Sequence, residues 1–228
     1  FGCIKIPTPP SPVSTLQTTN ISVNKIKICI IYVYYERINE QKNQTNLSFF
    51  IKYGLDKSRW RDVDITTLFV INGHQNEVLI PSRDDIFILK EDNCSDWEGW
   101  YNGIKFIVNK YNKPIYEIFS HLCLINASSF GPIYEDGKDN HWIDPFFNKM
   151  KEENAVICCP CSNKLTSDDL GGPGQRVSPI FSLIKIDNVV LKLLLNTKIY
   201  SFSNGTIGGW YNTILGKKIP HGPHPERT

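Results

Sequence analysis

Two kinds of apolar pattern alternate along the first half of the chain. Residues 25–35 (KIKICIIYVYY) and 65–72 (ITTLFVIN) are nearly continuous runs of β-branched and aromatic residues, the pattern of strands buried on both faces. Between them, residues 46–55 (NLSFFIKYGL) space their apolar side chains as a helix does and stop near a glycine suited to a helix C-terminus. These segments predict a β-α-β unit.

The same alternation then follows a second time. Residues 84–92 (DDIFILKED) predict a short strand, residues 97–111 (WEGWYNGIKFIVNKY) a helix, and residues 116–126 (YEIFSHLCLIN) another buried strand. The apolar face of this helix would consist of Trp100, Ile104, Ile107 and Val108. Alternating elements predict an α/β fold in one domain, with a mainly parallel central sheet flanked by helices. Ligands of such sheets bind beyond the carboxyl ends of the strands.

The pattern is less regular in the second half of the chain. Residues 141–151 predict a helix interrupted near Pro145, residues 155–159 (AVICC) a strand, and residues 167–176 (SDDLGGPGQR) a glycine-rich loop. Further apolar structure is predicted at residues 179–186, 189–195 and 207–219.

The two ends of the chain differ from this pattern. Residues 1–24 contain PTPPSPVSTLQTTN, whose composition predicts a linker or stem, and residues 220–228 form a tail. No run in the sequence has the roughly 18 to 20 apolar residues of a membrane span. Because the chain starts at Phe1, a membrane anchor can precede it, which would place the domain in the Golgi lumen. Without such an anchor, a cytoplasmic protein of a virus or microbe is expected.

Charge and cysteine content exclude some classes of function. Lys plus Arg number 25 and Asp plus Glu 23, without a basic block, which argues against nucleic acid as a partner. The seven cysteines are odd in number and irregular in spacing, which argues against a disulfide framework. The CCPC run at residues 158–161 lacks a second Cys or Cys/His pair, so we interpret it as a buried strand end rather than a zinc site.

Polar residues of related chemistry lie at the ends of the predicted strands and just after them. They are Asp96, Asn126, Ser128 and Ser129, accompanied by the aromatic residues Tyr34, Tyr35, Trp97 and Trp100. Carboxylate, amide and hydroxyl groups beside flat rings suit a hydroxyl-rich ligand whose base or sugar stacks on a ring. The alternative is structural: Trp100 lies in the core, Asp96 is the N-cap of the helix that includes WEGWYNGI, and Asn126 and Ser128 cap the next helix.

Six motifs together resemble a known family. They are IYVYYE (31–36), LFVINGH (68–74), DNCSDWEGW (92–100), INASSFGPIY (125–134), HWIDPFF (141–147) and GPGQRVSPIFSL (173–183). Their order resembles glycosyltransferase-like proteins of large DNA viruses, including chlorella viruses, and of algae and plants. That group is distantly similar to the bacterial rhamnan-synthesis F proteins. The resemblance covers roughly residues 27–219, and its most specific parts are Asp96 to Trp100 and Asn126 to Pro132.

The resemblance implies a GT-A fold within residues 25–219. A Rossmann-like nucleotide-sugar half would span residues 25–132, and an acceptor half residues 133–219. By this analogy the donor would contact Tyr34, Tyr35, Asp96, Trp100, Asn126 and Ser128. The acceptor would contact Glu135, His141 and Trp142. We expect Asp168 or Asp169, beside GGPG, to be the base that takes the proton of the acceptor hydroxyl, and Glu135 and Asp136 are further candidates. The alternative is that the loop at Asp168 and Asp169 is only a solvated turn.

Metal use is a separate question. GT-A enzymes normally carry a DxD motif that holds a divalent metal on the diphosphate, and here Asn126-Ala127-Ser128 stands at that place. An amide and a hydroxyl are neutral, weak ligands for Mn²⁺ or Mg²⁺, whereas carboxylates suit them. Asp96 is therefore the candidate metal ligand, and Lys138 or Arg176 could meet the diphosphate instead.

Two functions follow as hypotheses. The first is a glycosyltransferase that moves a hexose or deoxyhexose from a nucleotide sugar, UDP-linked by expectation, to a glycan or glycoprotein. The second is a non-catalytic glycan-binding or structural module that retains the fold. The missing DxD favours the second, as does the absence of a Glu that plant relatives carry near the stretch NGTIGGWYN (204–212).

Overall fold

The computed structural model describes residues 2–4, 25–35, 41–59, 62–73, 78–92, 94, 96–133, 141–160, 162–165, 174–177 and 181–187. Its strands are β1 (Gly2–Ile4), β2 (Ile26–Tyr35), β3 (Val63–Asn72), β4 (Ile86–Glu91), β5 (His121–Asn126), β6 (Ile157–Cys159), β7 (Ser162–Leu165), β8 (Gly174–Val177) and β9 (Phe181–Lys185). Its helices are α1 (Gln41–Phe49), the π-helical turn η1 (Phe50–Gly54), the 3₁₀ turn η2 (Lys57–Arg59), α2 (Asp96–Tyr111), α3 (Ile115–Ile118) and α4 (Asp144–Glu152).

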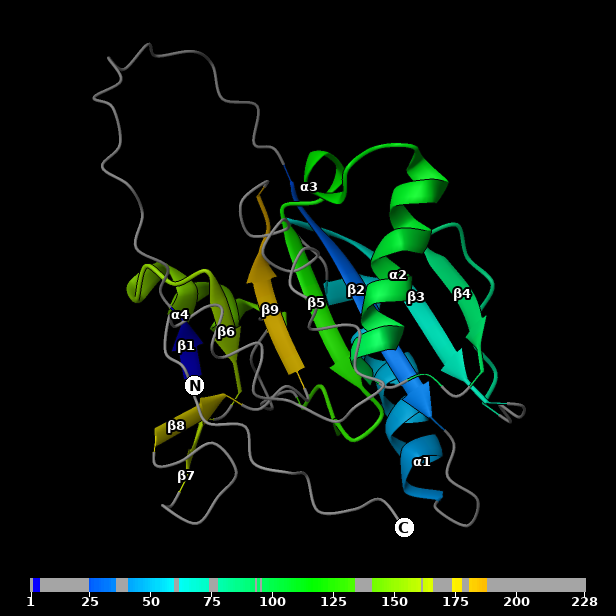
Figure 1. Ribbon diagram of the computed structural model, residues 1–228, viewed down its shortest axis with the longest axis horizontal. Helices are drawn as coiled ribbons and strands as arrows, with labels where there is room; N and C mark the ends of the chain where they lie inside the picture. The colour runs from blue at the N-terminus through cyan, green and yellow to red at the C-terminus, as the bar shows by residue number, and fades with distance from the viewer. Residues whose placement is uncertain are drawn as a thin grey trace.

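These elements form an α/β domain around a sheet in the order β1-β6-β9-β5-β2-β3-β4 (Figure 1). The neighbours β5, β2, β3 and β4 are parallel. β9 runs antiparallel to both β5 and β6, and β1 runs antiparallel to β6. Five of the seven strands in this sheet therefore run in one direction, and the sheet is mainly parallel, as the alternating pattern predicts. β7 and β8 form a separate two-stranded sheet.

β2 is buried on both faces because helices cover both faces of the sheet. Ile31 and Val33 of β2 pack in one core cluster with Trp100 and Ile104 of α2. Tyr32, between them in the sequence, points to the other face, where it packs with the cluster formed by α1, η1 and α4. Figure 1 shows α2 in front of β2 and β3, with α1 behind them. No helix in the described part of the chain is long and apolar enough to span a membrane.

The predicted strands at 25–35, 65–72, 84–92 and 155–159 and the helix at 97–111 are confirmed. Three predictions need correction. The helix predicted at 46–55 starts earlier, at Gln41, and ends as the π-helical turn η1. Residues 115–118 form a short helix, so the strand predicted from 116 starts only at His121. Pro145 lies in the first turn of α4, where a proline's missing N–H has no helical partner to lose, and so it starts that helix rather than interrupting it.

Several predicted segments lie outside the described residues. These are residues 189–195, 207–219 and 220–228, most of the glycine-rich loop at 167–176, and most of the linker at 1–24. At the edges of these segments, β8 includes the last residues of the predicted loop, and residues 2–4 of the predicted linker pair with β6.

Glycines let α2 lie close against β2, and this contact is testable. A methyl group at Gly103 would come within 2.7 Å of Cγ2 of Ile31 and 3.2 Å of Cδ2 of Leu68. We expect Gly103→Ala to lower the free energy of unfolding, because overpacking costs about 1 to 3 kcal/mol while the higher helix propensity of Ala returns at most roughly 1 kcal/mol. Urea denaturation should show this loss. Asn109→Ala, on the exposed face of α2, is the control and should not destabilise; equal effects of the two variants would contradict the close packing.

Burial of His121 predicts a loss of stability in acid. Burial, together with the positive charge of Lys185 in register on β9, lowers the pKa of His121 to about 4, from an ordinary value of 6.5. The unfolded chain therefore takes up a proton near pH 6.5 that the folded chain takes up only near pH 4. The free energy of unfolding should fall across this window by about 2 to 3 kcal/mol as the pH drops. Carboxylates titrate there too, so the measurement is the difference between the parent and His121→Gln in urea at pH 7 and pH 4.5. Parallel pH profiles would contradict the assignment.

Candidate functional site

The carboxyl ends of the four parallel strands lie along one edge of the sheet. β2 ends at Tyr35, β3 at Asn72, β4 at Glu91 and β5 at Asn126. α2 starts at the same edge, because it follows β4 after a short loop. We call this the strand-end edge, and it is where ligands bind in open α/β sheets.

The carboxylate of Asp96 is fixed at this edge by Asn126. Asn126 Nδ2 donates a hydrogen bond to Asp96 Oδ2 over 2.9 Å, and Asn126 Oδ1 accepts one from the Ser128 N–H over 3.1 Å. One buried amide therefore ties the first turn of α2 to the turn that follows β5. Sequence reasoning named all three residues, and the structure brings them together.

A second amide, that of Asn72, fixes the loop between β4 and α2. The Cys94 N–H donates to Asn72 Oδ1 over 3.0 Å, and Asn72 Nδ2 donates to the Cys94 carbonyl oxygen. Sequence reasoning did not assign Asn72 a role, although an Asn as the last residue of a buried strand was a usable signal. The side-chain amide of Asn72 thus binds both backbone polar groups of Cys94, and this fixes the loop that leads to Asp96.

The Cys94 thiol in this loop is protonated at neutral pH. Burial raises its pKa to about 12, and the nearby carboxylates of Glu91, Glu98 and Asp96 contribute in the same direction. Because the thiolate is the nucleophilic form, Cys94 is not poised as a nucleophile.

The two tryptophans of α2 have different environments. Trp100 is 1% exposed, and its indole N–H donates to the Ile125 carbonyl oxygen over 3.1 Å. Trp97 is half-buried and packs edge-to-face on Trp100, with ring centroids 5.0 Å apart. Trp100 is therefore a core anchor between α2 and β5, while part of Trp97 remains accessible at the first turn of the helix.

The other aromatic and histidine candidates divide in the same way. Tyr34 is fully buried, whereas Tyr35 is 40% exposed at the end of β2.

His141 is buried just before α4. Its backbone N–H donates to Asp144 Oδ2 over 2.9 Å, and its ring Nδ1 accepts from the Ile143 N–H over 3.2 Å. These two contacts organise the start of α4. Trp142 is 8% exposed and donates from Nε1 to the Gly54 carbonyl oxygen over 3.3 Å.

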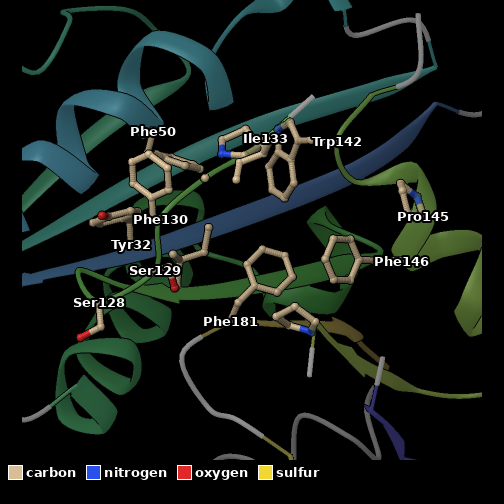
Figure 2. A pocket seen from close by; sticks show the side chains of 14 residues that line it. Tyr32, Phe50, Ser128, Ser129, Phe130, Ile133, Trp142, Pro145, Phe146 and Phe181 are labelled. Carbon is tan, nitrogen blue, oxygen red and sulfur yellow. The ribbon is translucent and has the colours of Figure 1, made fainter. Parts of the chain in front are cut away.

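A cavity of about 510 Å³ lies on the α1 and α4 face of the sheet, beside the chain that follows β5 (Figure 2). Its aromatic lining consists of Tyr32, Phe50, Phe130, Trp142, Phe146 and Phe181. Two serines, Ser128 and Ser129, also line it, and no charged residue is among the described residues of its wall. Sequence reasoning missed Phe146 and Phe181 as lining residues, although both lie in the quoted motifs.

The cavity and the strand-end edge share Ser128. Its exposed side chain lines the cavity, and its N–H is bound by the same amide that holds Asp96. Ser128 therefore connects the cavity wall to the residues that hold Asp96. This arrangement places a charged edge beside an uncharged aromatic chamber.

Several candidates cannot be placed. Glu135, Asp136, Lys138, Asp168 and Asp169 lie outside the described residues, and Arg176 is described only as part of the backbone of β8. Within the described ranges, no group of three His, Cys, Asp or Glu side chains could hold a metal ion. Asp96, whose Oδ2 accepts the Asn126 amide, stays a predicted metal ligand.

Comparison with known proteins gives a distant similarity. No family model matches the chain, and no curated protein matches it. Among solved structures, the mannosyltransferase Ktr4p from S. cerevisiae, in complex with GDP, is similar with a TM-score of 0.42 and 8% sequence identity. The alignment covers 91% of this chain and 68% of that one. A similarity at this level carries no argument about ligand or activity.

The anchor role of Trp100 predicts a loss of stability on truncation. Trp100→Ala should lower the free energy of unfolding by about 3 to 5 kcal/mol, because it leaves a large cavity between α2 and β5. Trp100→Phe keeps most of the ring volume and loses the bond to Ile125, so it should cost less. Trp97→Ala is the matched control at a half-buried position. Denaturation curves in which Trp97→Ala costs as much as Trp100→Ala would contradict the anchor role.

Proposed function

We propose that this protein is a glycosyltransferase of the GT-A type. It transfers a hexose or deoxyhexose from a UDP sugar to a glycan or glycoprotein acceptor. The observation that supports it is the carboxylate of Asp96, held by Asn126 at the carboxyl ends of parallel strands, where Ser128 also lines an aromatic cavity. The motif order in the sequence supports the same reading.

The donor would bind at the strand-end edge. A carboxylate accepts hydrogen bonds from the hydroxyl groups of ribose, and Asp96 is preorganised for this because Asn126 fixes its position. Tyr35 and Trp97 offer partly accessible rings on which a base can stack. The first turn of α2, a helix of 16 residues, carries the carboxylates of Asp96 and Glu98 at the positive end of the helix dipole, so it suits the hydroxyl groups of ribose rather than the diphosphate.

The transfer itself is a substitution at the anomeric carbon. The acceptor hydroxyl oxygen forms a bond to that carbon, the bond from the carbon to the diphosphate oxygen breaks, and the nucleoside diphosphate leaves. A carboxylate takes the proton of the hydroxyl. We assign this base to Asp168 or Asp169 as a proposal from the sequence, and Glu135, His141 and Trp142 to the acceptor side. No step is routed through a metal ion.

A glycan-binding module without catalysis is the second candidate, and one observation favours it. The amide of Asn126, which stands where a DxD carboxylate is expected, is engaged on both of its polar atoms with Asp96 and with Ser128. It therefore serves the structure of the edge. Binding of sugars without binding of nucleotide sugars would establish this candidate.

Donor binding tests the proposal through Asp96. We expect UDP-glucose, or another UDP sugar, to bind the parent in calorimetry, and Asp96→Ala to weaken binding roughly 10- to 100-fold, since hydrogen bonds to a charged group contribute about 1.5 to 3 kcal/mol. Thermal denaturation should show a folded variant. Glu98→Ala, in the same turn of α2, is the matched control and should keep the affinity within about twofold, as expected for an exposed carboxylate.

The titration is run with UDP, GDP and dTDP sugars, each with and without Mn²⁺. If none of these binds the parent, the proposal fails. If Asp96→Ala binds as the parent does, Asp96 is only part of the first turn of the helix.

A further inference from the structure

We propose that the aromatic cavity binds an uncharged, flat, apolar group, such as an aryl ring, that the acceptor carries beside its sugar. The role of this ligand as an acceptor rests on the proposed function, whereas the binding of an uncharged aryl group rests on the cavity alone. This assigns a ligand class to a site that the donor does not need.

The size and the lining of the cavity select this class. Its volume of about 510 Å³ lies in the range of small-molecule sites, roughly 300 to 1,000 Å³. The described residues of its wall include no charged side chain, so a diphosphate placed there would lose its hydration without a compensating partner. The described wall therefore disfavours the diphosphate of a nucleotide.

The arrangement of the rings favours a flat group. Phe181 packs against both Trp142 and Phe146, with ring centroids 5.8 and 4.7 Å apart. Their planes are inclined by 73° and 34°, so edges and faces both line the space. An aryl group can meet such rings in the offset or edge-to-face contacts that aromatic pairs prefer. A bare sugar needs many hydrogen bonds, and the described wall offers side-chain hydroxyls at Ser128 and Ser129 besides the buried Tyr32.

The polarity of the cavity sets the direction of the ligand. Figure 2 shows Ser128 on one side and Phe146 on the opposite side. Ser128 is also the link to Asp96 through Asn126. The sugar part of an acceptor would therefore lie at the serines, beside the donor, while its apolar group fills the aromatic end.

The rim of the cavity has the same character. Phe130 and Ile133 line the cavity and are 54% and 73% exposed, in the chain that follows β5. Large apolar side chains exposed beside a small-molecule cavity lose their contact with water when a ligand covers them. Both can be truncated without opening a hole in the core.

Direct binding to the full chain tests the inference. 4-Nitrophenyl glucoside should bind the parent at least tenfold more tightly than methyl glucoside, which has the same sugar without the ring. Phe130→Ala should weaken binding of the aryl glucoside roughly fivefold to tenfold, about the effect of one lost aromatic contact. Leu79→Ala is the matched control, because Leu79 is 90% exposed and does not line the cavity; it should leave the affinity within about twofold, as surface changes do. If Phe130→Ala does not fold, Ile133→Ser serves in its place.

Each outcome decides something. Absence of aryl glucoside binding, equal affinity for methyl glucoside, or equal effects of Phe130→Ala and Leu79→Ala would overturn the inference. UDP-glucose is titrated in parallel and should bind Phe130→Ala as it binds the parent. Donor binding without aryl glucoside binding would overturn the inference and leave the proposed function standing. Aryl glucoside binding without donor binding would support an aryl-binding cavity and overturn the proposed glycosyltransferase function.

Discussion

The close approach of α2 to β2 is the constraint on which the candidate site depends. Gly99 and Gly103 face Val33 and Ile31 so closely that an added methyl carbon would stand within 3 Å of either side chain. This contact lets the indole of Trp100 reach the carbonyl of Ile125 on the neighbouring strand. Because α2 is held both against β2 and to Ile125 of β5, its first residue, Asp96, is fixed relative to the end of β5.

The strand-end edge is then made rigid by two asparagines. Asn126 and Asn72 each use both ends of an amide, one to hold Asp96 and the turn after β5, the other to hold the loop at Cys94. An amide suits this task because it donates and accepts in one plane. The buried amides are satisfied within the protein, so the edge presents the Asp96 carboxylate in a fixed position, which is the property that ligand recognition requires.

The sequence predicts the parts of this structure that local patterns determine. The strand 25–35 and the helix 97–111 follow from runs and periods of apolar residues, and both form as expected. The hydrogen bond from Asn126 to Asp96 does not follow, because it depends on which strand lies beside β5 and on where α2 starts. The position of Phe181 in the cavity wall does not follow from local patterns either, because β9 lies antiparallel between β5 and β6, and both are far from it in the sequence. The helix interruption predicted near Pro145 is wrong because a proline in the first turn starts a helix, whereas one in the interior breaks it.

The division of polarity at Ser128 explains why the two candidate sites are best understood together. On the side of Asp96 the edge offers a carboxylate at the first turn of a helix, which suits the ribose hydroxyl groups of a nucleotide. On the side of Phe181 the described wall is uncharged and aromatic, which excludes those parts and suits a flat apolar group. Ser128, exposed at the cavity wall and bonded through its N–H to Asn126, belongs to both regions.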